Sequence, residues 1–186
     1  MVAIEKGLMN RIELIEAQTR TASSPYYAIN ASGRVPYLVR DDGQTMEDSQ
    51  LIGLYLDQLG SGPSLAVPFS QGDWTYGRLE TYARSFVDGL SVYIREMRRP
   101  ANERSPTVLT HETDRALRLA DFWNQEISHP LMQSPVNFAQ LLLIVGLDVG
   151  AHSKIADLEA GRPALAAWAA RMRMREAVRE TVLRAG

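Results

Sequence analysis

The sequence predicts a small α/β domain followed by an all-helical domain. The chain of 186 residues changes character near residue 60, because short elements of mixed type precede this point and long helical periods follow it. Between the two parts lies a stretch of glycine, serine and proline, residues 60–64, with a further proline at position 68. We therefore expect an α/β domain over residues 1–59, a linker over 60–70 and a helical domain over 71–186.

The first part carries the signals of short helices and strands. Residues 2–6 are typical of the end of a helix, and Gly7 is placed to cap its C-terminus. The partial alternation of residues 11–17 predicts a strand. Residues 23–32, which mix serine, proline, tyrosine and asparagine, predict a short helix or a loop.

A hairpin and a helix complete this domain. Two short strands, residues 36–40 and 44–46, flank an Asp-Gly pair, which favours a tight turn with positive φ at both turn positions. Residues 49–59 predict a helix with Ser49 as its N-cap. The expected apolar face of this helix consists of Leu51, Ile52, Tyr55, Leu56 and Leu59.

The second part predicts a bundle of long helices. Apolar residues recur at helical spacing from Leu79 to Met97, ahead of Pro100, and again from Leu109 to Ile127. A third helix, residues 138–150, is apolar nearly all round and is expected in the middle of the bundle.

The starts of the last two helices also carry signals. Asn137 and Gln140 have the spacing of a capping box, in which each side chain binds the other residue's backbone N–H. Pro163 suits the first turn of a fourth helix, which we expect to continue through Val178 to Val182.

Composition excludes several classes of protein. The 20 basic and 22 acidic residues lack the electrostatic footprint of a nucleic-acid-binding protein. The absence of cysteine excludes a disulfide framework, a thiolate metal site and a cysteine nucleophile within these residues. The longest apolar run, residues 141–147, is too short to span a bilayer, and no signal peptide is visible. These features predict a soluble, cytoplasmic protein, and no pattern predicts a metal site.

One group of residues has the chemistry to bind a short peptide. Pro36 opens a strand without donating to a ladder, and a cis bond there would leave the backbone of Val35 free to pair with an extended ligand. An acid and a hydroxyl, Asp48 and Ser49, follow at a helix start, where free N–H groups attract a carboxylate. Asp48 would hold a ligand ammonium. The alternatives are a proline that only punctuates a strand and a serine that only caps a helix.

The order of these motifs resembles the cytosolic glutathione transferase family, and the resemblance covers nearly the whole chain. Residues 28–36 are similar to the family's loop before its cis-proline, with Ser32 and Arg34 as departures. Residues 48–52 match the bacterial Asp-Ser form of the glutathione-binding turn. Further similar segments lie at 98–106, 137–140 and 163–172. The resemblance implies a thioredoxin-like N-terminal domain and a C-terminal helical bundle.

The resemblance also implies roles for individual residues. Val35 would present its backbone to the cysteinyl unit of glutathione, and Pro36 would be the cis-proline. Asp48 and Ser49 would hold the γ-glutamyl end, and Arg34 would reach the glycyl carboxylate. The wall facing an electrophilic substrate is assigned to Tyr93, Met97 and Trp123, for which plain packing in the core is the alternative.

The thiolate-stabilising residue of the family has no counterpart here, so no catalytic residue is assigned. In the family a Ser, Tyr or Cys near the start of the first helix holds the glutathione sulfur as a thiolate, and residues 1–22 contain none of these. The resemblance therefore implies an α/β domain lacking its first strand and the start of its first helix. Two explanations stay open: the biological chain begins upstream of Met1, which we favour, or the protein is a degenerate member of the family.

These observations predict a transferase that adds the glutathione thiolate to a small hydrophobic electrophile. Glutathione is its co-substrate, and no other cofactor is expected. The alternative is a non-catalytic module on the same scaffold that binds glutathione, another ligand or a protein. A homodimer is implied by the resemblance alone.

Overall fold

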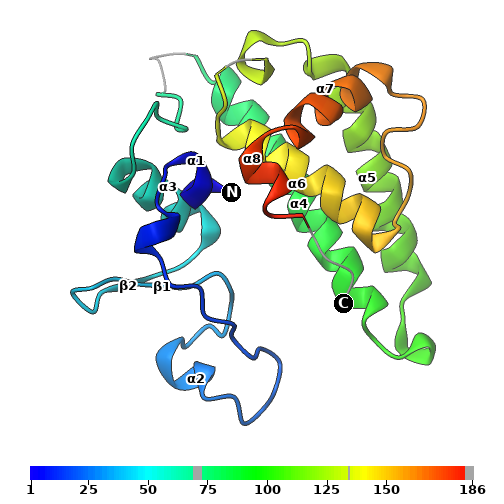
Figure 1. The fold of residues 1–186 in the computed structure, drawn as a ribbon. Helices are drawn as coiled ribbons and strands as arrows, with labels where there is room; N and C mark the ends of the chain where they lie inside the picture. The colour runs from blue at the N-terminus through cyan, green and yellow to red at the C-terminus, as the bar shows by residue number, and fades with distance from the viewer. Residues whose placement is uncertain (69–72, 134, 183–186) are drawn as a thin grey trace. The chain divides into compact units, whose positions relative to one another are not determined.

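The computed structural model describes residues 1–68, 73–133 and 135–182. The chain divides into two compact units, Val2–Ser64 and Leu65 onward, each drawn in Figure 1. The first unit combines short helices with a hairpin, whereas the described part of the second is helical. The predicted order of an α/β part and a helical part is therefore confirmed. Part of the expected linker, residues 69 and 70, lies outside the described residues.

Short elements surround one apolar cluster in the Val2–Ser64 unit. In chain order they are α1 (Val2–Glu5), η1 (Met9–Arg11), α2 (Tyr26–Ile29), β1 (Leu38–Val39), β2 (Thr45–Met46) and α3 (Ser49–Leu59). The buried residues of the cluster are Leu8, Ile52 and Leu56, and Ile12, Leu38 and Met46 pack against them. The hairpin and α3 are thus anchored on the same core.

The end of α1 is joined to the end of α3 by a buried ion pair. Gly7 has φ of +65°, and the amides of Gly7 and Leu8 donate to the carbonyls of Ile4 and Ala3, which confirms the predicted cap. Just before this cap, Lys6 Nζ lies 3.0 Å from Asp57 Oδ1, with both side chains at most 3% exposed. This pair ties the chain's first helix to its third.

The strand predicted over residues 11–17 is wrong. Arg11 ends η1, and the backbone of residues 12–17 forms no hydrogen bond with any described residue. Leu14 and Ile15 are adjacent, so one side chain faces each side of the extended chain, and both are nearly 80% exposed. A strand needs both a partner and one apolar face, and this segment has neither among the described residues.

The predicted hairpin is confirmed, but its turn differs. β1 and β2 are antiparallel, with Leu38 opposite Met46 and Val39 opposite Thr45. Within the turn only Gly43 has positive φ, at +80°, and the amide of Arg40 donates to Gln44 O over 2.9 Å. The loop therefore has three residues with glycine in the left-handed position, instead of the two-residue turn expected from Asp-Gly.

The second unit is a bundle around α6. Its elements are α4 (Thr75–Met97), η2 (Ala101–Glu103), α5 (Pro106–Glu126), η3 (Pro130–Met132), α6 (Phe138–Ser153), α7 (Pro163–Arg173) and α8 (Glu176–Arg179). α6 packs against α4 and α7, as its apolar surface predicts, and is the yellow helix in Figure 1. In the parts of the chain that the structure describes, no helix is both long and apolar enough to cross a membrane.

One of the two hydrogen bonds of the predicted capping box forms at the α6 N-terminus. Asn137 Oδ1 accepts from the amide of Gln140 over 3.1 Å, as predicted. The reciprocal bond, from the Asn137 amide to Gln140 Oε1, does not form among the described residues, and Gln140 Nε2 donates to the carbonyls of Leu131 and Pro135. Asn137 Nδ2 also donates to Leu131 O, over 2.7 Å. Both side chains thus fasten the preceding η3 segment to the start of α6.

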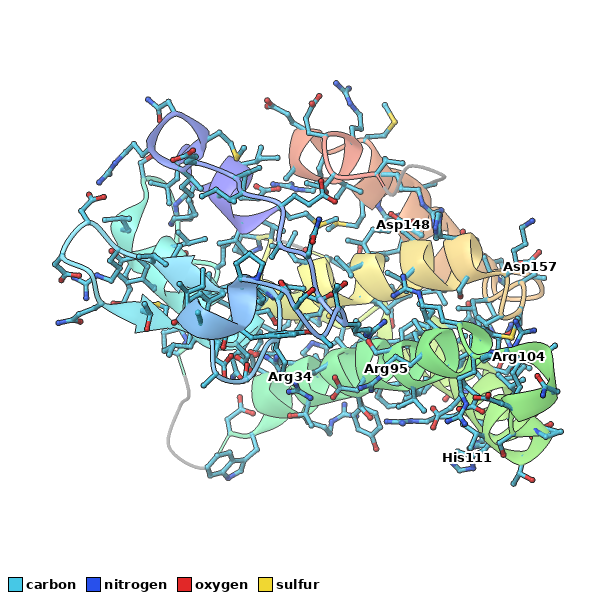
Figure 2. The ribbon with its side chains drawn as sticks, turned by 90° about the horizontal axis from the view of Figure 1, so that it is seen from below. Arg34, Arg95, Arg104, His111, Asp148 and Asp157 are labelled. Atoms are coloured by element: carbon cyan, nitrogen blue, oxygen red, sulfur yellow. The ribbon has the colours of Figure 1, made fainter. Side chains whose placement is uncertain are left out.

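The last predicted helix is divided in two. α7 ends at Arg173, and Arg175 has ψ of 140°, which breaks the helix before α8. Arg173 bridges Asp148 on α6, labelled in Figure 2, and Glu159, with N–O distances of 2.8 and 2.6 Å. Hydrogen bonds to Glu159 and then to Asp148 raise the pKa of this guanidinium above its usual range. Val182, expected on the helix face, is 60% exposed.

Candidate functional site

The loop between α2 and β1 is built on the buried side chain of Asn30. Asn30 Nδ2 donates to Tyr26 Oη and to the carbonyl of Arg34, each over 2.8 Å. Its Oδ1 accepts from the amide of Ser32 over 3.0 Å. Tyr26 Oη also donates to the Arg34 carbonyl. One asparagine therefore fixes both sides of this turn.

Val35 presents a free main chain at the end of this loop. Its peptide bond to Pro36 is cis. Neither the N–H nor the carbonyl of Val35 bonds to any residue that the structure describes, and the side chain is 58% exposed. Peptide groups without partners must bond to water or to a ligand. Val35 is thus available to pair with an extended peptide.

The start of α3 lies next along the chain and carries an acid and a hydroxyl. Asp48 is the N-cap of this helix, because its Oδ1 accepts from the amides of Gln50 at 2.8 Å and Leu51 at 3.3 Å. The expected cap, Ser49, is the first helical residue instead. Asp48 Oδ2, the Ser49 amide and the Ser49 hydroxyl have no hydrogen-bond partner among the described residues. One carboxylate oxygen and two donors are therefore left for a ligand.

A side-chain hydrogen bond connects the loop with the segment before α3. Ser32 Oγ donates to Glu47 Oε2, and Glu47 directly precedes Asp48. Arg34, labelled in Figure 2, is exposed, and its guanidinium pairs with no described residue. The predicted residues Arg34, Val35, Asp48 and Ser49 thus lie on two segments that Ser32 and Glu47 join.

Three residues that support this site were not predicted from the sequence. Tyr26 and Asn30 hold the loop, and Glu47 holds it to the segment before α3. Asparagine is common where a side chain replaces a backbone partner in a turn. The residue type of Asn30 could therefore have indicated its role in the loop. Nothing in the sequence identifies Tyr26 or Glu47 as the partners.

Comparison with known proteins gives a family match for the N-terminal part of the chain. Residues 1–59 match the family described as "Glutathione S-transferase, N-terminal domain". The N-terminal part of the chain is therefore similar to the N-terminal domain of glutathione S-transferases. The uncharacterised glutathione S-transferase-like protein YibF of Escherichia coli K12 is 26% identical over 121 residues, or 65% of this chain. The match spans 59% of YibF, less than two thirds of that protein.

Solved structures show the same fold over almost the entire chain. A glutathione transferase family member from Pseudomonas fluorescens Pf-5, with bound glutathione, is 23% identical and superposes with a TM-score of 0.88 over 99% of this chain and 91% of its own. A glutathione S-transferase from Methylobacillus flagellatus KT, also with glutathione bound, is 21% identical with a TM-score of 0.84, over 97% and 90% of the two chains. This chain therefore has the glutathione S-transferase fold, and the sheet in the described N-terminal part consists of two strands, β1 and β2.

The residues assigned to the electrophile wall differ in exposure. Tyr93 and Met97 are half-buried on α4. Trp123 on α5 is fully buried, and its indole N–H has no hydrogen-bond partner among the described residues. Burial of Trp123 agrees with the alternative of plain core packing. The role of these three residues stays a prediction.

Gly33 allows the loop backbone to lie close to the Tyr27 ring, and a substitution tests this. Its φ is +63°, and an added Cβ would lie 2.6 Å from Tyr27 Cε1. Tyr27 Oη accepts a hydrogen bond from the Arg20 amide, so moving the ring breaks this contact. We expect Gly33→Ala to destabilise the Val2–Ser64 unit by about 1–2 kcal/mol from the left-handed backbone and about 1–3 kcal/mol from overpacking. Thermal unfolding followed by far-UV circular dichroism measures the change.

Gly43→Ala is the matched control. Gly43 also has positive φ, but an added Cβ there meets nothing within 4 Å. The control therefore isolates the backbone contribution from the steric one. Equal losses of stability in the two variants would contradict a close approach of Tyr27 to Gly33.

Proposed function

We propose that the Val2–Ser64 unit binds glutathione and that the protein conjugates it to small hydrophobic electrophiles. The observation that carries the proposal is that the unpaired main chain of Val35 and the unused groups of Asp48 and Ser49 lie on two segments joined by the Ser32–Glu47 hydrogen bond. The relatives from Pseudomonas fluorescens and Methylobacillus flagellatus, which share the fold, were solved with glutathione bound.

Each end of glutathione meets a group of suitable charge in this proposal. The cysteinyl unit pairs with the backbone of Val35 as a short added strand. The α-carboxylate of the γ-glutamyl end binds the Ser49 amide and hydroxyl at the α3 N-terminus, where the helix dipole favours an anion. Asp48 Oδ2 faces the ammonium of the same end, and Arg34 pairs with the glycyl carboxylate.

Glutathione binding is tested by isothermal titration calorimetry on Ser49→Ala and Asp48→Asn. We expect each variant to bind about tenfold more weakly, because hydrogen bonds to charged groups contribute about 1.5–3 kcal/mol. Ser49→Ala leaves the helix cap in place, since Asp48 supplies it. Asn caps as well as Asp, so Asp48→Asn removes the charge and keeps the helix start.

Ser128→Ala provides the control for loss of an exposed hydroxyl. Ser128 lies in the second unit, and its Oγ makes only a 3.4 Å contact with Gln125 O. We expect this variant to bind glutathione as the unaltered chain does. Failure of the unaltered chain to bind glutathione, or equal affinity in all variants, would refute the proposed site.

Turnover is measured separately with a chloronitrobenzene acceptor. In that reaction the glutathione sulfur forms a bond to the ring carbon, chloride leaves, and the thiol proton passes to solvent. Binding without turnover favours the alternative of a non-catalytic glutathione-binding module. A homodimer and a cytoplasmic location belong to the same proposal, and sedimentation analysis tests the first.

A further inference from the structure

The carbonyl of Arg34 is held by two buried side chains. Asn30 Nδ2 donates to it over 2.8 Å, and Tyr26 Oη donates to it as well. Asn30 is 3% exposed and Tyr26 is 8% exposed. Asn30 also donates to Tyr26 Oη, so the two donors support each other. The Arg34 carbonyl is thus fixed toward the interior of the loop.

Fixing this carbonyl also fixes the direction of the Val35 amide. The peptide bond between Arg34 and Val35 is trans, since the two cis bonds among the described residues are Val35–Pro36 and Glu47–Asp48. In a planar trans peptide, the C=O and the following N–H point in opposite directions. With the Arg34 carbonyl turned inward, the Val35 N–H points away from Tyr26 and Asn30. No described residue accepts this N–H.

We infer that Tyr26 and Asn30 are positioning residues, which orient the Val35 N–H for a hydrogen bond to the peptide backbone of the ligand. The inference rests on the proposed glutathione site. It adds the two residues that orient one hydrogen-bond donor of that site, the Val35 N–H. Without the two buried donors, the Arg34–Val35 peptide plane can rotate and turn the amide away from the ligand. A donor that is already oriented binds more tightly, because less conformational entropy is lost on binding.

Tyr26→Phe and Tyr37→Phe form a matched pair of variants. Each removes one tyrosine hydroxyl that donates to a main-chain carbonyl of the same segment, Arg34 for Tyr26 and Ile29 for Tyr37, the latter over 2.8 Å. Their rings also contact each other edge to face, with centroids 6.2 Å apart. Both variants remove a hydrogen bond from a tyrosine hydroxyl to a main-chain carbonyl. Tyr26→Phe also removes the acceptor of Asn30 Nδ2, which is the other donor to the Arg34 carbonyl, so only Tyr26→Phe affects the peptide plane of Val35.

We expect Tyr26→Phe to weaken glutathione binding about fivefold, the effect of one net hydrogen bond, and Tyr37→Phe to change it less than about twofold. Calorimetric titration gives both affinities, and thermal unfolding checks that the two variants are equally stable. An equal loss of affinity in both variants overturns the inference, because a general loosening of the loop would then explain the result. Unchanged binding by Tyr26→Phe overturns it as well.

The 13C chemical shift of the Arg34 carbonyl provides a test without ligand. We expect Tyr26→Phe to change this shift and Tyr37→Phe to change that of Ile29 instead. An unchanged Arg34 shift in Tyr26→Phe overturns the inference while leaving the proposed function intact. If the unaltered chain binds no glutathione, the proposed function fails first, and the orientation of Val35 toward that ligand fails with it.

Discussion

Replacing Lys6 with methionine is expected to destabilise the Val2–Ser64 unit by about 3–5 kcal/mol. Lys6 and Asp57 are almost completely buried, and Lys6 Nζ also donates to the carbonyls of Gly62 and Pro63. Asp57 Oδ2 accepts from Ser64 Oγ over 2.8 Å. Methionine fills a similar volume but leaves the Asp57 carboxylate buried without its cation. It also leaves two carbonyls without the donor they share.

Amide hydrogen exchange of α3 measures this loss in the unit concerned. The chain's tryptophans, Trp74, Trp123 and Trp168, all lie beyond residue 64, so tryptophan fluorescence does not report directly on this unit. We expect the α3 amides to exchange faster in Lys6→Met, at a temperature where the unaltered chain protects them. Adding Asp57→Leu should recover part of the stability, because it removes the buried charge that Lys6 neutralises in the unaltered chain.

Arg99→Met is the control for loss of a paired cation. The Arg99 side chain is 52% exposed, and its contacts to Glu96 and Glu103 are 3.9 and 3.6 Å long. An exposed pair of this kind contributes at most about 1 kcal/mol. If Lys6→Met cost no more than Arg99→Met, the Lys6–Asp57 pair would not be a buried link between α1 and α3.

The long helices were predictable because each buries one face over many turns. The periodicities from Leu79 to Met97 and from Leu109 to Ile127 correspond to α4 and α5, and the apolar run after Asn137 corresponds to α6. Because the apolar spacing repeats over several turns, a single residue that departs from it does not hide the helix. The Lys6–Asp57 pair has no such signal, since its partners are separated by about fifty residues and either one alone resembles a surface charge.

Short elements were predicted less well, because tertiary contacts determine whether they form and where they begin and end. Residues 11–17 alternate, but a strand also needs a hydrogen-bonded neighbour, which the described residues do not supply. Both Asp48 and Ser49 are good N-caps, and the backbone of Asp48, with φ of −96° and ψ of −162°, decides between them. The break between α7 and α8 at Arg175 carries no glycine or proline to predict it.

The sequence predicts which main-chain groups of the candidate site are available to a ligand. It does not predict the side-chain contacts that hold these groups in place. The sequence singles out Val35, Asp48 and Ser49 as candidates because proline and a helix start leave backbone groups without local partners. The contacts that orient these groups join Tyr26 to Arg34 and Ser32 to Glu47. Such contacts depend on how the loop folds back on itself, which local sequence patterns do not encode.

In the helical unit, Phe86→Ala is expected to cost about 3–5 kcal/mol of unfolding free energy. Phe86 on α4 is 1% exposed, and its ring lies against Gly146 of α6, where an added Cβ would be 2.6 Å from Phe86 Cδ1. Removal of the ring leaves a cavity between two long helices that both span the core. Urea unfolding followed by tryptophan fluorescence reports the loss, because Trp123 and Trp168 are buried in this unit.

The role of Gly146 can be separated from that of Phe86 by a double-mutant cycle. In the unaltered chain we expect Gly146→Ala to destabilise by about 1–3 kcal/mol, because the buried ring cannot move aside. In the Phe86→Ala background the new methyl group enters the cavity, and alanine is better than glycine in a helix by about 1 kcal/mol. Gly146→Ala should therefore change from destabilising to stabilising. The same sign in both backgrounds would contradict a direct contact, and would mean that Gly146 serves the helix itself and not the crossing of α4 and α6.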